Sequence, residues 1–200
     1  MARSALYNFL LFLCPILSAQ YSLSQTGEVK FLSRIYTDSS SGQVQMARLF
    51  SSSVAPLSAT VPAGLLLTGI IKKDSALIEK GIQASVAFAF NAIVTSGIKY
   101  GADRRRPYTI YPDLFHAKDK VEGYSFPSGH TSFSFAAATS LSLSCPKWYV
   151  IVPVYGWACA VAYSRMQLGV HYPTDVLMGA LIGTASSFLS FKIDRLMRKK

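Results

Sequence analysis

The recurrence of apolar segments is the feature that most constrains how this 200-residue chain can fold. Five apolar segments follow one another, separated by short polar connections: 53–71, 82–98, 133–144, 148–163 and 176–191. Each has the length of a helix, and none shows the sustained alternation of apolar and polar residues that marks a half-buried strand. Turn signals such as Cys145-Pro146-Lys147 separate them. We therefore expect an all-α fold, a bundle of five to six mostly transmembrane helices.

The lengths of these segments leave two environments open. At a rise of 1.5 Å per residue several segments are only about 24–29 Å long, against roughly 30 Å of bilayer hydrocarbon. Such helices can cross a membrane with snorkelling ends or form the interior of a soluble bundle. Because 50% of the residues are hydrophobic and only 15% are charged, the composition favours the membrane.

The N-terminal quarter of the chain differs from the rest. Residues 1–19 place Arg3 before a short apolar stretch that ends in small residues, which is typical of a signal peptide, although an uncleaved first membrane helix fits as well. Residues 20–52 are polar and rich in Ser and Gln with scattered apolar positions, so we expect an amphipathic or surface-lying arm. We expect residues 53–200 to form a single helical domain.

The excess of basic residues indicates an anionic partner. Lys and Arg number 20 against 10 Asp and Glu, giving a formal charge of +10. Phospholipid headgroups or a phosphorylated substrate fit this charge. Nucleic acid does not, because the cations lie between apolar runs and do not follow one polar face.

Charge placement also predicts a topology, because short cytoplasmic loops collect Lys and Arg. If the chain enters from outside after its first segment, Lys72, Lys73, Lys80, Lys147 and the basic C-terminal tail all fall inside. The connections over 99–128 and 164–171 then fall together outside. Residues 104–106 are three arginines on that outer side, which breaks the rule unless they have another role.

Three motifs end apolar segments on this outer side: Lys99-x6-Arg106-Pro107, Pro127-Ser128-Gly129-His130, and Ser164-Arg165-x5-His171-x3-Asp175. Positioned cations and N–H donors stabilise the charge of a transferring phosphoryl group, and Lys99, Arg106 and Arg165 are such cations. Ser128 and Gly129 precede an apolar helix, whose positive end would add an oxyanion cradle. Histidine can change protonation near neutral pH. The three motifs together therefore predict a phosphate site, although each alone would be an ordinary surface or capping feature.

In their residue types and spacing the three motifs resemble the signature of the type 2 phosphatidic acid phosphatase (PAP2) superfamily, which includes bacterial acid phosphatases and vanadium haloperoxidases. The resemblance implies that His171 is the nucleophile that takes the phosphoryl group. Asp175, one helical turn onward, would orient its ring. His130 would be the general acid and later the base. It implies that Lys99, Arg106, Ser128, Gly129 and Arg165 bind phosphate, and that neither a metal nor another cofactor is needed.

Some residues near the motifs keep an ordinary interpretation. Arg104 and Arg105 lie outside the motif register, and we expect them to contact headgroups or solvent. His116 lies in a polar stretch and is expected in a loop. Cys14, Cys145 and Cys159 show no metal-ligand spacing and are expected to pack as small residues.

The resulting hypothesis is a metal-independent phosphatase that acts on a lipid phosphate or lipid diphosphate through a phosphohistidine. Its partners would be the membrane and a phospholipid or polyprenyl phosphate. The resemblance places it in the bacterial inner (cytoplasmic) membrane with its site facing the periplasm. The alternatives are a soluble periplasmic acid phosphatase, a vanadate-dependent haloperoxidase, and a non-catalytic protein that binds or transports anionic lipids. The sequence assigns no oligomeric state.

Overall fold

The computed structural model describes residues 27–36, 40–119 and 121–197. The expected signal peptide or first membrane helix, residues 1–19, lies outside this part of the chain. Within the described residues every regular element is a helix. The all-α prediction is therefore confirmed.

A helix over residues 27–36 precedes the labelled elements. The others are α2 (Ser41–Ser52), α3 (Val54–Lys72), α4 (Ser75–Ala102), α5 (Pro107–Ile110), α6 (Gly129–Ser144), α7 (Trp148–Gln167) and α8 (Pro173–Met197). Each of the five expected apolar segments lies in one long helix, in the order α3, α4, α6, α7 and α8. The helices extend beyond the apolar segments, because polar residues beside each segment also adopt the helical conformation.

The helix boundaries have local causes in the sequence. Ser40 and Gln43 form a reciprocal capping box at the start of α2. The carboxylate of Asp74 accepts the N–H groups of Ala76 and Leu77 at the start of α4. Residue Lys73, between α3 and α4, takes the left-handed conformation that ends many helices, with φ of 54°. These caps allow α3 and α4 to reverse direction within a few residues.

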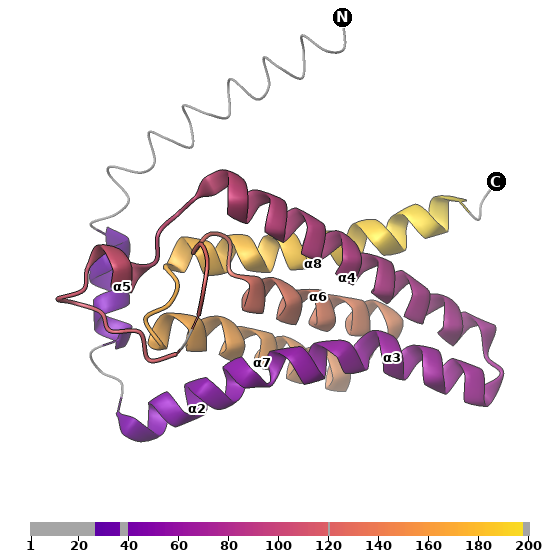
Figure 1. Cartoon of the computed structure of the whole chain (residues 1–200). Helices are drawn as coiled ribbons and strands as arrows, with labels where there is room; N and C mark the ends of the chain where they lie inside the picture. The colour runs from indigo at the N-terminus through magenta and orange to yellow at the C-terminus, as the bar shows by residue number, and fades with distance from the viewer. Residues whose placement is uncertain (1–26, 37–39, 120, 198–200) are drawn as a thin grey trace, which may run out of the picture.

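Helix α6 is the centre of the bundle, packed against α8, α7, α4 and α3 (Figure 1). Its interior face consists of small side chains, including Ala136, Ala137 and Ala138, all nearly fully buried. Gly179 and Gly183 of α8 face it, and a Cβ atom built on Gly179 would lie 2.6 Å from the Ser128 carbonyl oxygen. Small residues on both helices therefore permit the close approach between α6 and α8.

Within the part of the chain that the structure describes, three helical stretches are long and apolar enough to cross a membrane: Ser41–Lys72, Ser75–Ile110 and Pro173–Ile193. Large apolar side chains point outward on them, and Ile71 and Ile93 are 79% and 72% exposed. Outward-facing aliphatic residues on long helices suit a hydrocarbon surround. These helices indicate a membrane protein. Helix α6, with only 16 residues, lies inside the bundle they help to form.

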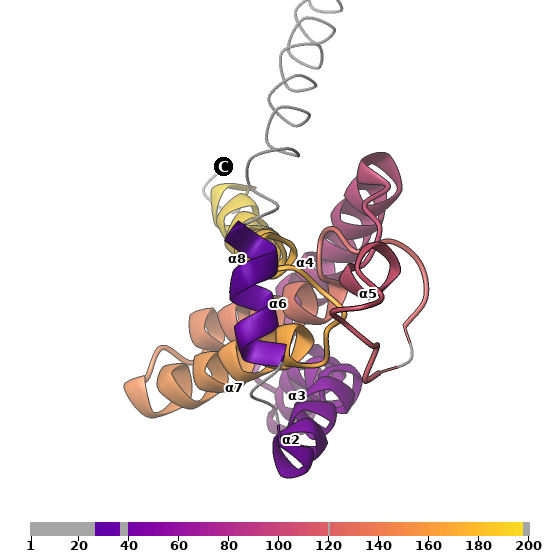
Figure 2. The same cartoon turned by 90° about the vertical axis from the view of Figure 1, so that its left-hand side faces the viewer.

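The connections separate into two groups at opposite ends of the bundle (Figure 1). The connections from α4 to α6 and from α7 to α8 share one end, as the charge pattern predicts. The α3–α4 turn and the α6–α7 connection share the other, where Lys80 Nζ donates to the Ser144 carbonyl oxygen at 2.9 Å. Figure 2 shows the helix over 27–36 lying across the first of these ends.

Candidate active site

All three sequence motifs meet at the end of the bundle that carries the long connection between α4 and α6. Lys99 lies in the last turn of α4 and Arg106 immediately precedes α5. Ser128 is the N-cap of α6, and Arg165 lies in the last turn of α7. His171 lies in the α7–α8 connection, and Asp175 in the first turn of α8. The ends of five helices, α4 to α8, thus bring the motif residues to one end of the bundle, around the buried imidazole of His171.

The His171 ring is held between a cation and a carboxylate. Its Nε2 atom lies 3.2 Å from Arg106 Nη1, and its Nδ1 atom lies 3.5 Å from Asp175 Oδ2 and from Ser125 Oγ. A guanidinium can only donate, whereas the ionised carboxylate can only accept. We infer that Nδ1 carries the proton and that Nε2 presents its lone pair toward Arg106.

The protonation of His171 follows from its surroundings. The residue is only 2% exposed. Burial lowers its pKa to about 3, Asp175 opposes the shift, and Arg106 and Arg165 add to it. The imidazole is therefore neutral near pH 7, which leaves Nε2 able to act as a nucleophile.

The carboxylate of Asp175 is fully buried and accepts hydrogen bonds from several directions. Its Oδ2 atom accepts from Ser125 Oγ at 2.5 Å and from the backbone N–H of Tyr172 at 2.8 Å. Its Oδ1 atom accepts from Arg104 Nη1 at 2.6 Å. These bonds fix the plane of the carboxylate next to the His171 ring.

Arg106 and Lys99 are held by backbone carbonyl groups of the loops. Arg106 donates to the carbonyl oxygens of Gly123, Glu122 and Val170 at 2.9–3.0 Å. Lys99 Nζ donates to the carbonyl oxygens of Tyr124 at 2.7 Å and Pro127 at 3.0 Å. Because carbonyl groups orient these cations without neutralising them, their charge remains available to an anion.

Arg165 has unmet hydrogen-bonding capacity. Its guanidinium is fully buried, and its Nη1 atom donates to Asp119 Oδ2 at 2.8 Å and to Ser51 Oγ. No described residue accepts a hydrogen bond from its Nε or Nη2 atoms. Leaving a buried donor unpaired costs about 1–3 kcal/mol, so an anion bound here would relieve a real penalty.

The start of α6 provides donors of a different kind. The Ser128 side chain caps the helix by accepting the Thr131 N–H, and the Ser128 backbone N–H donates to the Asp175 carbonyl oxygen at 3.0 Å. That second bond occupies one of the two backbone donors expected for the cradle. The N–H groups of Gly129 and His130 lie in the first turn, where a helix supplies no acceptor.

His130 lies in this first turn, outside the three candidate membrane stretches. Burial lowers its pKa to about 4, and Arg165 lowers it further. Asp119 opposes the shift, and Arg106 and Lys99 add smaller lowering effects. The three motif cations, Arg165, Arg106 and Lys99, are all among the charges that act on this histidine. His130 is therefore a member of the same electrostatic site as Arg106 and Arg165.

Several residues that were not expected from the sequence contact motif side chains: Ser125, Arg104, Asp119 and Ser51. Glu28 was not expected either, and it reaches the site through Arg104 and the backbone N–H of Thr174. Glu28 and Ser51 belong to the expected arm over 20–52, which thus contributes directly to the site. The arginine run on the outer side pointed to a role for Arg104 or Arg105, but no sequence signal pointed to Glu28, Ser51, Asp119 or Ser125. Arg105 and His116 are exposed, in agreement with their expected ordinary roles.

Among the described residues, no group of three or more His, Cys, Asp or Glu side chains converges as metal ligands would. Acidic groups at the site are instead paired with arginines, as in the contact between Asp119 and Arg165. The described motif residues instead place the cations Arg106, Arg165 and Lys99 in the electrostatic surroundings of the two histidines.

Comparison with known families settles the classification. The family model for the PAP2 superfamily matches residues 80–198, more than half of the chain. The chain belongs to the PAP2 superfamily. This match includes all three motifs and confirms the resemblance inferred from them. The PAP2 region extends from the start of α4 to the end of α8.

Curated PAP2 relatives share between a third and two fifths of aligned residues. An undecaprenyl-diphosphatase of Sulfolobus acidocaldarius is 35% identical over 114 residues, 57% of this chain and 55% of that protein. A lipid A 4'-phosphatase of Bacteroides thetaiotaomicron is 37% identical over 71 residues, and phosphatidylglycerophosphatase B of Haemophilus influenzae is 38% identical over 80 residues. The chain thus covers about half of the first relative's length and 32% of each of the other two.

Solved PAP2 structures share the fold. Aquifex aeolicus LpxE superimposes with a TM-score of 0.71 and 24% identity, covering 82% of this chain and 94% of that one. A transmembrane PAP2-type phosphatidylglycerolphosphate phosphatase from Bacillus subtilis gives a TM-score of 0.71 and 22% identity, covering 94% and 95%. Identities this low establish the bundle architecture alone.

Proposed function

We propose that this protein is a phosphatase that removes phosphate from a lipid phosphate or lipid diphosphate through a phosphohistidine on His171. One observation carries the proposal: the buried guanidinium of Arg165 has two donor atoms without a described partner, in the electrostatic site of a neutral imidazole. A phosphoryl group offers the several oxygens needed to accept from these atoms and from Arg106.

In the first step, His171 Nε2 attacks phosphorus and the bond between phosphorus and the leaving oxygen breaks. His130 donates a proton to that oxygen. The cations Lys99, Arg106 and Arg165 and the first-turn N–H groups of α6 stabilise the charge on the equatorial oxygens. Asp175 accepts from Nδ1–H and stabilises the positive charge that the ring gains on phosphorylation.

In the second step, His130 accepts a proton from water, and the oxygen of that water attacks the phosphohistidine. The bond between Nε2 and phosphorus breaks, which releases inorganic phosphate and restores neutral His171. The low pKa of His130 keeps its ring unprotonated near pH 7, so that it has a lone pair to accept the proton. A bound phosphate anion would raise that pKa and prepare His130 to act as the acid.

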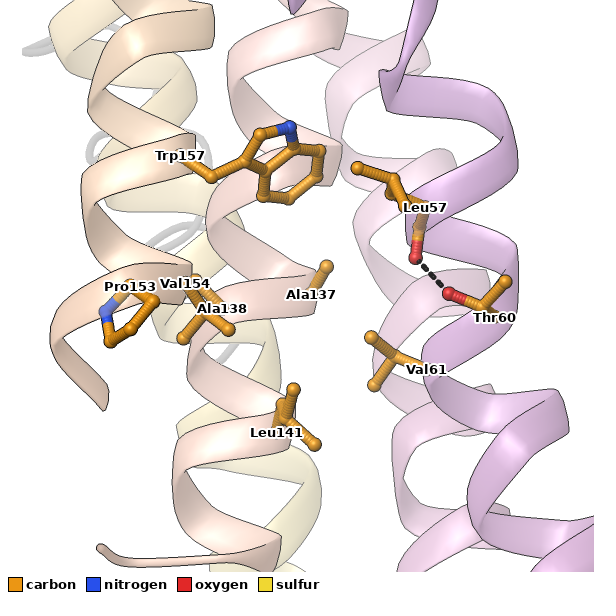
Figure 3. Close-up of a pocket in the computed structure, with 9 residues that line it drawn as sticks. All are labelled: Leu57, Thr60, Val61, Ala137, Ala138, Leu141, Pro153, Val154 and Trp157. Carbon is orange, nitrogen blue, oxygen red and sulfur yellow. Dashed lines mark hydrogen bonds between the residues drawn. The ribbon is translucent and has the colours of Figure 1, made fainter. Parts of the chain in front are cut away.

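An apolar cavity favours a lipid substrate over a soluble one. The cavity, of about 310 Å³, lies between α3, α6 and α7 (Figure 3). Val61 of α3, Leu141 of α6 and Trp157 of α7 line it, and the Trp157 indole N–H is satisfied by Ser53 Oγ at 3.0 Å. Ala137, another lining residue, follows His130 by seven positions, or ~10 Å along α6. An acyl or prenyl chain could lie there with its phosphate at the histidines.

The relatives support the same substrate class, because their names describe phosphatases of undecaprenyl diphosphate, lipid A and phosphatidylglycerophosphate. Each is a phosphorylated lipid.

We also propose a location in the cytoplasmic membrane, with the histidine end facing the periplasm. The positions of Lys73 and Lys147 at the opposite end favour this orientation.

Phosphate release by the detergent-solubilised protein tests the proposal. The substrates are lipid monophosphates, lipid diphosphates and p-nitrophenyl phosphate, each assayed with EDTA. We expect lipid preference that persists in EDTA. His171→Asn and His130→Asn should lower turnover at least about 1,000-fold, whereas His116→Asn, in the exposed loop, should not. Full turnover by His171→Asn would refute the covalent mechanism, and binding of phospholipid without turnover would favour the lipid-binding alternative.

The cavity is tested separately. Val61→Phe narrows it, and Ile71→Phe places the same side chain at the exposed far end of α3. We expect Val61→Phe to raise the KM for a long-chain lipid phosphate several-fold and to leave p-nitrophenyl phosphate unaffected. Equal effects on both substrates would show that the cavity does not hold the chain.

A further inference from the structure

Arg104 and Glu28 connect the helix over 27–36 to the carboxylate beside His171. Arg104 Nη1 donates to Asp175 Oδ1 at 2.6 Å, and Arg104 Nη2 donates to Glu28 Oε2 at 2.8 Å. The side chains of Arg104 and Glu28 are only 12% and 10% exposed. Ion pairs with this little exposure are weakly screened and geometrically fixed.

Arg104 has further contacts beyond these two ion pairs. Its Nη1 atom also donates to Thr174 Oγ1 at 2.7 Å, and its Cζ atom lies 4.0 Å from the centre of the Tyr172 ring. Arginine combines a planar donor fork with stacking on an aromatic face, which lysine cannot do. The guanidinium therefore presents one defined edge to Asp175.

Glu28 restrains the start of α8 as well as Arg104. Its Oε1 atom accepts the backbone N–H of Thr174 at 3.0 Å, a first-turn donor that has no acceptor within α8. A carboxylate at this position also interacts favourably with the positive end of the helix. Glu28 therefore holds both the arginine that contacts Asp175 and the turn that carries Asp175.

The helix over 27–36 is itself anchored at this end of the bundle. Leu32 is fully buried in a cluster with Phe115 and Tyr172. The Tyr36 hydroxyl contacts the backbone of His116, donating to its carbonyl oxygen at 3.1 Å. Glu28 is thus presented by a packed element and reaches the site from a fixed position.

We propose that Glu28 and Arg104 are positioning residues that hold the Asp175 carboxylate in the orientation that binds His171 Nδ1–H. The inference rests on the proposed function, since it concerns the alignment of the same nucleophile. Arg104 restrains Oδ1, and the carboxylate then presents Oδ2 to the ring. Without the arginine, rotation of the carboxylate would loosen the ring, and Nε2 would spend less time in line with phosphorus.

Kinetics of Glu28→Gln and Arg104→Gln test this role, with Arg105→Gln as the matched control on an exposed neighbour. We expect kcat to fall about tenfold in Glu28→Gln and up to about 100-fold in Arg104→Gln, as for other groups that orient a reacting ligand, while KM changes less than about twofold. Arg104→Lys should recover only part of the loss, because it keeps the charge without the fork. The loss of kcat in the double variant should be smaller than the product of the two single losses, since Glu28 acts in part through Arg104.

Nitrogen-15 spectra of the histidine rings provide a readout that needs no turnover. The wild-type protein should show a protected Nδ1–H proton on His171, assigned by its loss in His171→Asn. That signal should broaden in Glu28→Gln and Arg104→Gln and persist in Arg105→Gln. An unchanged signal in both variants would overturn the inference. If the wild-type protein releases no phosphate, the proposed function fails, and the spectra still decide whether Glu28 and Arg104 position the ring.

Discussion

The burial of a neutral His171 gives the protein a predictable response to acid. Burial lowers the pKa of this residue to about 3, whereas the unfolded chain titrates near the ordinary value of 6.5. Between these values the unfolded state binds a proton that the folded state does not. The free energy of unfolding therefore falls as pH falls from 6.5 toward 3.

At pH 5 this residue alone should reduce the free energy of unfolding by about 2 kcal/mol relative to pH 7. Thermal unfolding in detergent at both pH values measures the effect. His171→Asn should lose less stability than the wild type over the same interval, and His116→Asn should behave like the wild type. Equal acid sensitivity of the wild type and His171→Asn would contradict the low pKa.

Arg165 leads to a prediction about anions. Because two of its donor atoms have no described partner, inorganic phosphate or vanadate should bind the folded protein and raise its Tm. A ligand at 100 times its Kd stabilises by roughly 2.7 kcal/mol. Arg165→Lys should lose most of this shift, since a lysine cannot supply the same fork. Arg105→Lys is the control, and a full shift in Arg165→Lys would exclude this guanidinium as an anion ligand.

At the scale of the helices, the contact between α6 and α8 determines where Asp175 lies relative to the start of α6. Gly179 and Gly183 bring the backbones together, and the Ser128 N–H bonds to the Asp175 carbonyl oxygen at the end of this contact. The interhelical contact thus sets the spacing between the carboxylate and the first turn of α6.

A methyl group at Gly183 would overlap the Ser132 carbonyl oxygen, which is backbone and cannot rotate away. Gly183→Ala should therefore destabilise the protein by about 2–3 kcal/mol and reduce turnover, because α8 must move away from α6. Gly97→Ala, where a Cβ atom would meet nothing within 4 Å, should be neutral or stabilising by about 0.5–1 kcal/mol. Unfolding in detergent compares the two, and similar stabilities would refute the close packing of α6 on α8.

At the scale of the whole molecule, the two ends of the bundle differ in the residues that they carry. One end carries the histidines and the other carries Lys73, Lys80 and Lys147. This asymmetry predicts an orientation in the membrane. A chain inserted with the lysine end inside would expose the histidine end to lipid phosphates of the outer leaflet.

Labelling with a membrane-impermeant maleimide measures this orientation. In a background where Cys14, Cys145 and Cys159 are replaced by Ser, Asp113→Cys places a thiol at the histidine end and Lys73→Cys at the lysine end. We expect Asp113→Cys to react in intact cells and Lys73→Cys to react only after permeabilisation. The reverse pattern would place the active site on the cytoplasmic side.

The number and order of the long helices could be read from the chain, because an apolar segment of helical length must be buried in protein or lipid wherever it occurs. The motif residues could also be found from the sequence, because the spacing within each motif is local. Their positions at the ends of apolar segments predicted that they lie at one end of the bundle. The order of charged connections along the chain also predicted which loops lie together. The structure brings the connections from α4 to α6 and from α7 to α8 to one end of the bundle.

Only the tertiary structure revealed which residues contact and position the motif side chains. Arg104 had no signal in sequence to separate it from Arg105, yet one contacts Asp175 and the other faces solvent. Glu28 lies 147 positions before Asp175, so no local pattern could connect them. The sequence determines which side chains can do the chemistry, whereas their partners depend on long-range packing, which brings distant helix ends within hydrogen-bonding distance.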